Sequence, residues 1–319
     1  MVDKGLPLRG LARPLGLLLV CLSLLFISER IWSHRLWLAD WRPDIATLAM
    51  VVAGILGYGL GSLLLSAAWT RLLHWVGEDG ARFRACHAVY GRTQIAKYLP
   101  GNVFQYAGRQ LLGGRAGLTQ LGMAAASIYE ILAFLLAAGA LGALGMLVLD
   151  ISAGDQLTPV RLGLILAGGA GLLIGATLAA PRVARLAGVE RGLFDGGSLW
   201  RDLLPAFAAY GAFVVLMGLI LAALVAVAFG IPSTRELGIV IAGFAVAWVA
   251  GFVTPGAPGG LGVREAVMLL FLAPIVGESV GLVSVLLFRI VTVLGDLLFF
   301  VTALVPGSLP ESRTTASPD

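Results

Sequence analysis

The chemistry of this chain depends on ionisable side chains that interrupt long apolar stretches. Glu130 lies within one such stretch, and Arg289 and Asp296 lie in another, seven residues apart and therefore on one face of a helix. Arg264 and Glu265 begin a third stretch, where the helix dipole would favour the glutamate. Guanidinium groups bind phosphate through paired hydrogen bonds, and carboxylates can neutralise them or carry protons. These residues predict a buried, charged site for an anionic group.

Two interpretations of these charges remain open. In the first, Arg109, Arg264 and Arg289 bind a phosphate-bearing headgroup, and Glu130 and Asp296 balance their charge or carry a proton. In the second, Arg289 pairs with Asp296 or with Glu130 and only holds helices together. An ionisable group at the centre of a bilayer costs about 2.5–3.5 kcal/mol on insertion scales. Each buried charge therefore needs a role, and either headgroup binding or helix pairing would supply one.

A run of glycine and proline separates two apolar pieces, 237–253 and 263–276. A helix does not propagate through such a run, because glycine and proline are the poorest helix formers. In hydrocarbon the freed backbone groups need hydrogen-bond partners, so the break must be buried in protein or line a wet cavity. A tight cytoplasmic turn between two spans is the alternative. The helix-break residues of this run are Pro255, Gly256, Gly259, Gly260 and Gly262.

A second break divides the segment 84–116 at Pro100 and Gly101. Apolar residues recur at helical spacing before it, and a short apolar piece follows. Two half-helices joined in this way indicate a re-entrant hairpin that dips into a membrane without crossing it. An amphipathic helix on the cytoplasmic face is the alternative. Lys97 and Tyr98 lie just before the break, and we assign them to the same predicted site.

The two breaks share one spacing, since Arg109 follows Pro100 by nine residues and Arg264 follows Pro255 by nine. Three predicted spans lie between them, which would invert one half relative to the other. Matched broken helices in two inverted halves point to a transport site near the membrane midplane. The two halves would also be inverted if 237–276 forms two membrane spans and not a hairpin. Six spans with two hairpins and eight spans with one hairpin therefore both remain open.

The elements that position this site are predicted to be membrane helices. Apolar residues make up 59% of the 319 and charged residues only 13%, and the mean hydropathy is +0.94. Soluble domains carry about 25% charged residues. The two cysteines are too few for a disulfide scaffold. This composition excludes a cytosolic enzyme and a disordered chain, and it predicts an all-α integral membrane protein of six to eight spans.

A span needs about 20 mostly apolar residues, and the chain offers eight stretches of that length or somewhat shorter. They form one predicted membrane domain, 14–305, between a cytoplasmic N-terminus, 1–13, and a polar cytoplasmic tail, 306–319. If the N-terminus is inside, 15 of the 22 basic residues fall in cytoplasmic segments and 5 in external ones. The positive-inside rule therefore places both termini in the cytoplasm. The stretches are 14–31, 45–69, 121–148, 162–180, 203–229, 237–253, 263–276 and 282–304.

The sequence contains no phosphate-binding loop, no zinc-binding helix and no nucleophile elbow. We therefore expect no cofactor, no metal and no nucleic acid partner, and we expect a transporter or a membrane accessory protein in preference to an enzyme. An intramembrane enzyme that uses Glu130 or Glu265 as acid or base is a third hypothesis.

Two motifs resemble those of a known family. The segment 94–101, followed by Gly108 and Arg109, is similar to the x-Tyr-Leu/Ile-Pro-Gly element of the lysylphosphatidylglycerol synthase transmembrane-domain family. The segment 255–265 is similar to its second signature, Pro-Gly-Gly-x-Gly-x-x-Glu. The resemblance extends over roughly 15–305. It implies that Arg109, Arg264 and Glu265 occupy positions of the family's motifs.

The resemblance implies the flippase-like fold of the bacterial multiple peptide resistance factors, with re-entrant helices around a headgroup cavity in the bacterial inner membrane. The chain shows no counterpart of that family's synthase domain, so we do not expect it to make lysylphosphatidylglycerol. The cargo would be a phospholipid, an aminoacyl-phospholipid or a polyprenyl-linked glycolipid. The alternative is an accessory protein of an envelope glycolipid or polysaccharide pathway, with a glycosyltransferase or synthase as its partner. Neither the motifs nor the composition predicts an oligomeric state.

Overall fold

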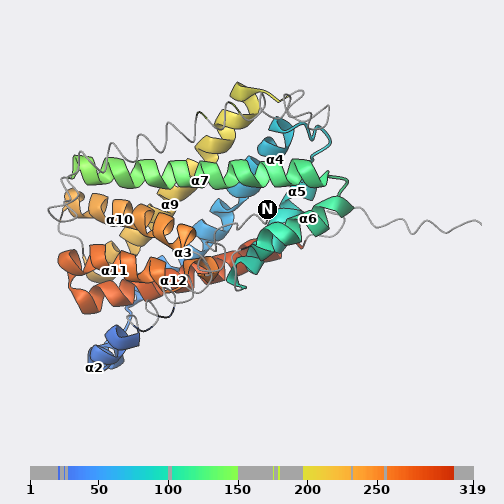
Figure 1. The fold of residues 1–319 in the computed structure, drawn as a ribbon. Helices are drawn as coiled ribbons and strands as arrows, with labels where there is room; N and C mark the ends of the chain where they lie inside the picture. Colours follow the sequence, from blue (N-terminus) through green and yellow to red (C-terminus); the bar gives the residue numbers. More distant parts are fainter. Residues whose placement is uncertain are drawn as a thin grey trace, which may run out of the picture.

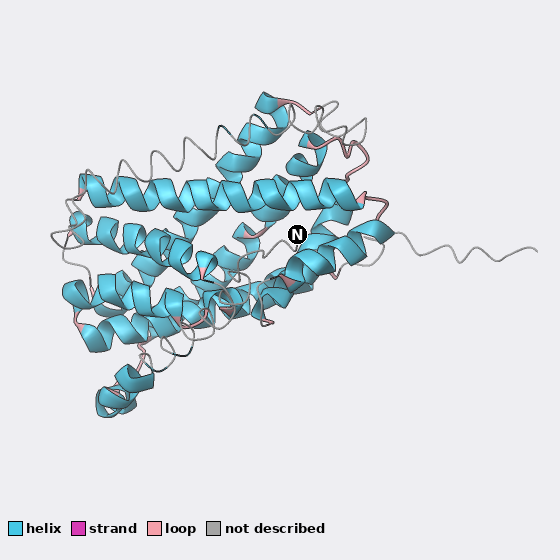
Figure 2. Cartoon of the chain, in the orientation of Figure 1, coloured by secondary structure: helices cyan, strands magenta, loops and turns pink. Residues whose placement is uncertain are grey.

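The computed structural model describes residues 28–99, 103–149, 197–230, 233–254 and 257–304, together with positions 21, 25, 175 and 179. Every element in these ranges is helical, and the long helices form one bundle (Figure 1; Figure 2). The all-α prediction is thereby confirmed for the described part of the chain. The predicted span 162–180, most of 14–31 and the tail 306–319 lie outside the described residues.

Five helices of the described ranges are long and apolar enough to cross a membrane, and each matches a predicted span. The chain is therefore a multi-pass membrane protein. The five are Ile45–Trp75, Gln120–Val148, Leu199–Phe229, Thr234–Val253 and Glu278–Thr302.

The first of these five spans combines α3 (Ile45–Gly61) and α4 (Leu63–Trp75). Ser62 separates the two helices and donates a hydrogen bond of 2.8 Å from Oγ to the Tyr58 carbonyl oxygen. Asp44 accepts from the Thr47 amide at 2.7 Å and so caps the start of α3. The short helix α2 (Arg35–Asp40) precedes them.

Three further helices complete the centre of the bundle. They are α7 (Gln120–Val148), α9 (Leu204–Phe229), which continues the short π-turn η2 (Leu199–Leu203), and α12 (Glu278–Thr302). In Figure 1, α7 runs the length of the bundle, and α12 lies below it. Thr119 caps α7 by accepting a hydrogen bond from the Gly122 amide, and Gly230, with φ of 76°, ends α9.

Small residues let these helices pack closely, as is typical inside membranes. A Cβ added at Gly145 of α7 would lie 2.3 Å from the Ala242 Cβ of α10 (Thr234–Val253). A Cβ added at Gly295 of α12 would lie 2.5 Å from the Tyr58 ring of α3. The glycine at 295 therefore allows Tyr58 to reach the centre of the bundle.

Two helix hairpins flank the bundle at opposite ends (Figure 1). The first hairpin comprises α5 (Phe83–Gln94), the 3₁₀ turn η1 (Ile95–Tyr98) and α6 (Phe104–Arg115). The second comprises α10, the turn η3 (Pro258–Gly260) and α11 (Val263–Val276). Helices are thus present on both sides of each predicted break. The 14 residues of α11 are too few for a straight span of about 20, although the apolar piece 263–276 is helical as expected.

The second hairpin is antiparallel and reaches only to the middle of α12. Gly277, with φ of 83°, reverses the chain between α11 and α12. From there α11 runs back along α12 until Glu265, near its first turn, contacts Arg289, midway along α12. The tip of this hairpin therefore lies beside the centre of α12.

The first hairpin approaches the same place from the other end. Near the C-terminus of α12, Arg92 of α5 donates a hydrogen bond of 3.0 Å to the Ala303 carbonyl oxygen. Seven residues beyond Arg289 along α12, Asp296 is contacted by Lys97 and Tyr98 of η1. The tips of both hairpins thus meet α12 between positions 289 and 296.

Candidate functional site

The tips of the two hairpins touch one another where they meet α12. The turns η1 and η3 are in contact, and a Cβ added at Gly259 would lie 3.5 Å from the Tyr98 ring. Both Gly259 and Gly260 have positive φ, at 57° and 75°, a conformation that residues with a side chain rarely adopt. Glycine at these positions permits both the turn and the close approach of Tyr98.

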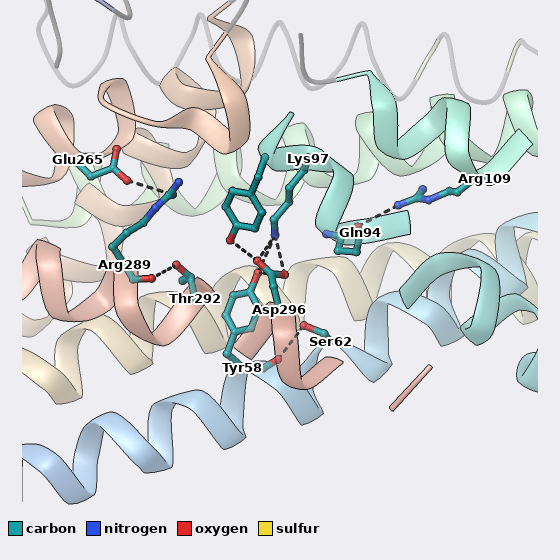
Figure 3. A network of polar contacts seen from close by, with 10 residues as sticks. Tyr58, Ser62, Gln94, Lys97, Arg109, Glu265, Arg289, Thr292 and Asp296 are labelled. Carbon is teal, nitrogen blue, oxygen red and sulfur yellow. Dashed lines mark hydrogen bonds and ion pairs between the residues drawn. The ribbon is translucent and has the colours of Figure 1, made fainter. Parts of the chain in front are cut away.

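Asp296 forms the centre of a polar network at this meeting point (Figure 3). Its side chain accepts hydrogen bonds from the Tyr58 hydroxyl at 3.0 Å and from the Tyr98 hydroxyl at 2.5 Å. Lys97 Nζ lies 2.7 Å from Oδ2 of the same carboxylate and donates to the Tyr58 hydroxyl at 3.1 Å. Asp296 is only 2% exposed, so these donors replace the water that a carboxylate would otherwise need.

A second ion pair joins the other hairpin to α12. Glu265 Oε1 lies 3.2 Å from Nη1 of Arg289 (Figure 3). The other oxygen of Glu265 accepts a hydrogen bond of 2.7 Å from the Gly262 amide, which caps the start of α11. The glutamate thus has both the N-terminal role expected from the helix dipole and an ionic role.

A third pair lies deeper in the first hairpin, where Arg109 of α6 pairs with Glu130 of α7. Arg109 is fully buried, and its guanidinium carbon lies 3.8 Å from the centre of the Tyr90 ring. Tyr90 in turn donates a hydrogen bond of 2.6 Å to Glu130, and the Gln94 side chain accepts from Arg109 at 3.3 Å. This arrangement holds α5, α6 and α7 together.

A cavity of about 90 Å³ lies beside the hairpin tips. It has room for several water molecules. Aromatic side chains of the central helices form its apolar part, and polar side chains of both tips form the rest. The charged residues among those that line it are Lys97, Glu130, Arg264 and Arg289.

Arg264 differs from the other cations at the site. Among the described residues, no carboxylate lies within ion-pair distance of it, and its buried Nε has no hydrogen-bond partner. Its guanidinium carbon lies 5.8 Å from the centre of the Trp248 ring. A Cβ added at Gly260 would lie 3.2 Å from Arg264 Nε, so the glycine leaves space for the guanidinium.

The structure brings most of the predicted site residues together. Eight of them, spread over 97–296 in the sequence, fall in the three ion-paired groups or line the cavity: Lys97, Tyr98, Arg109, Glu130, Arg264, Glu265, Arg289 and Asp296. Gly259, Gly260 and Gly262 lie at the tip of the second hairpin. The remaining helix-break residues, Pro100, Gly101, Pro255 and Gly256, lie outside the described residues.

One expected pairing was wrong. One of the two interpretations of the buried charges pairs Arg289 with Asp296 or Glu130, but in the structure Arg289 pairs with Glu265. Seven residues of helix separate Arg289 from Asp296 by about 10 Å along the axis, although they share a face. Each therefore contacts a different hairpin tip.

Several functional contacts were missed at the sequence level. Tyr58, Tyr90 and Gln94 each hydrogen-bond a charged group of the site, and Trp248 lies beside Arg264. A tyrosine between two glycines in an apolar span, as at 57–59, is the one available signal, because a buried hydroxyl requires a partner. The partner itself becomes known only from the packing.

No known family model matches this sequence, and no curated protein is significantly similar to it.

Proposed function

We propose that this chain is a flippase-like transporter that moves a phosphate-bearing lipid across the cytoplasmic membrane of a bacterium. The observation that carries the proposal is the cavity at which the tips of two opposed hairpins meet inside a bundle of apolar helices. Broken helices that end near the midplane supply polar backbone and charge where a lipid headgroup must pass. The resemblance of both hairpin tips to the motifs of a lipid-flippase domain supports the same conclusion.

In this proposal both hairpins are re-entrant, and the two halves are related as an inverted repeat. The first enters from the cytoplasm and the second from the outside. Each tip is attached to α12 by its own ion pair, Lys97 with Asp296 and Glu265 with Arg289. Separating one pair while the other holds would open the cavity toward one side at a time, which is the requirement for alternating access.

The hairpin geometry can be tested with a membrane-impermeant maleimide. In a background where Cys21 and Cys86 are replaced by serine, we expect Leu99→Cys, near the first tip, to react from the cytoplasmic side. We expect Leu261→Cys, near the second tip, to react from the outside. Gly80→Cys, in a loop predicted to be inside, and Arg235→Cys, in the first turn of α10 and predicted to be outside, serve as controls for sidedness. Reaction of both tips from the cytoplasm alone would contradict the inverted arrangement.

The transport activity is tested with the purified full chain in proteoliposomes that contain headgroup-labelled lipids. We expect transbilayer movement of at least one phosphate-bearing lipid above that in protein-free vesicles. Arg264→Ala should slow this movement about tenfold or more, as expected from losing a charged hydrogen-bonding group. Arg115→Gln, at the exposed end of α6, should leave it unchanged.

The alternatives predict other results in the same experiment. An accessory protein would move none of the lipids and would co-purify with a glycosyltransferase or synthase. An intramembrane enzyme would convert a substrate into a new compound. Either result would contradict the transporter proposal.

A further inference from the structure

Each carboxylate of the site forms an ion pair with one cation, and one further cation has no carboxylate partner in the described ranges. The three carboxylates of the site each hold a different cation: Asp296 holds Lys97, Glu265 holds Arg289, and Glu130 holds Arg109. Arg264 is the fourth cation and has no carboxylate within ion-pair distance in the described ranges. The described part of the site therefore has a net charge of about one positive unit.

The surroundings of Arg264 show why this charge needs an anion. The guanidinium lines the cavity, and its Nε is buried without a hydrogen-bond partner among the described residues. The nearby ring of Trp248 supplies only a weak cation–π contact at 5.8 Å. A partly buried cation that lacks an anion is costly, and part of that cost is recovered when an anion arrives.

We propose that Arg264 binds a single negative charge of the transported headgroup, so that the cavity selects lipids with one phosphodiester group over those with a phosphomonoester or a diphosphate. This inference rests on the proposed function and specifies its substrate class. A phosphodiester carries one negative charge, whereas a phosphomonoester carries about 1.5 to 2 at neutral pH. The guanidinium offers a planar pair of donors that matches two phosphate oxygens.

The paired cations explain the discrimination against more highly charged groups. A second negative charge would be neutralised only if Lys97 left Asp296, or if Arg289 left Glu265. Either movement would leave a buried carboxylate without its cation and would detach a hairpin tip from α12. A headgroup with one charge is bound without disturbing either pair.

The test measures binding, not transport, with the purified full chain in detergent. The probes are three dihexanoyl lipids: phosphatidylmethanol, which has one phosphodiester charge, phosphatidic acid, which has a phosphomonoester, and the uncharged diacylglycerol. We expect the chain to bind phosphatidylmethanol about tenfold more tightly than either of the others. Arg264→Gln should abolish this preference over diacylglycerol, and the exposed Arg115→Gln should keep it.

A second variant, in which the charge of Glu265 is removed, tests whether the number of unpaired cations sets the preference. Glu265→Gln keeps an oxygen that can accept from the Gly262 amide but releases Arg289 from its ion pair, which leaves two unpaired cations. We expect this variant to prefer phosphatidic acid. In the double variant Arg264→Gln/Glu265→Gln only one cation, Arg289, lacks a carboxylate partner. We expect this variant to prefer phosphatidylmethanol again.

The inference is wrong if Arg264→Gln still prefers phosphatidylmethanol to diacylglycerol as the wild type does. It is also wrong if Glu265→Gln still prefers phosphatidylmethanol to phosphatidic acid. Thermal unfolding of each variant shows that it is folded before binding is measured. Because binding is measured without transport, failure of the two proposals can be told apart. A chain that shows the expected binding but moves no lipid contradicts the transporter, and a chain that moves diphosphate lipids fastest contradicts the role of Arg264.

Discussion

Replacing Asp296 by alanine is expected to abolish lipid movement and to lower the free energy of unfolding by about 3–5 kcal/mol, the usual cost of breaking a buried ion pair. The change removes the acceptor of three donors at once, since Tyr58, Tyr98 and Lys97 all contact this carboxylate. It leaves the Lys97 ammonium without an anion and releases the first hairpin tip from α12.

The measurements are thermal unfolding in detergent and lipid movement in proteoliposomes. Asp296→Asn serves as the conservative control, because the amide oxygen still accepts from one tyrosine while the charge is lost. The double variant Lys97→Met/Asp296→Leu should recover part of the stability, since apolar residues of similar size can replace a buried pair, whereas the Tyr58 and Tyr98 hydroxyls still lack their acceptor. It should not recover transport, because the tip can no longer exchange its ionic contact. Full transport in the double variant would contradict the role we give this pair.

Replacing Glu130 by alanine is expected to destabilise the chain by a similar amount, about 3–5 kcal/mol, but for a structural reason. Arg109 is fully buried and would lose its only carboxylate among the described residues, and the Tyr90 hydroxyl would lose its acceptor. The double variant Arg109→Met/Glu130→Leu should regain the part of the stability that is lost through the unpaired Arg109, whereas the buried Tyr90 hydroxyl still lacks its acceptor. We expect it also to retain lipid movement, because this pair joins α6 to α7 and does not attach a tip to α12.

Unfolding and transport are measured on the same preparations. A double variant that is as stable as the wild type but moves no lipid would show that Arg109 contacts the headgroup directly. That outcome would restore the three-arginine clamp that the sequence alone suggests, in which Arg109, Arg264 and Arg289 all bind the phosphate. The single arginine of our proposal predicts the opposite result.

Much of the fold was predictable because hydrophobic length is a strong local signal. The spans 121–148 and 203–229 are confirmed as helices to within a few residues, and the breaks near Pro100 and Pro255 separate helices as expected. Glycine and proline act locally, so their effect on a helix can be read without knowledge of its neighbours.

The partners of the buried charges were less predictable. Spacing along α12 placed Arg289 and Asp296 on one face, but it does not show which element packs against each turn of that face. The choice depends on how far each hairpin extends, and this follows from the tertiary packing. The tyrosines that support the carboxylates were missed for the same reason, because Tyr58 reaches Asp296 only where Gly295 leaves space.

The two contacts on α12 are opposite in polarity. At the first tip the hairpin supplies the cation, Lys97, and α12 the anion; at the second tip the hairpin supplies the anion, Glu265, and α12 the cation. If the two hairpins form the proposed inverted repeat, that repeat would be symmetric in shape but antisymmetric in charge. In that arrangement a lipid entering from one leaflet would first meet a tip that carries a lysine, and one entering from the other leaflet would first meet a tip that carries a glutamate. The two leaflets would therefore present chemically different entrances to the same cargo. The rate constants for loading would differ between the leaflets, while the lipid gradient across the membrane would set the net direction of movement.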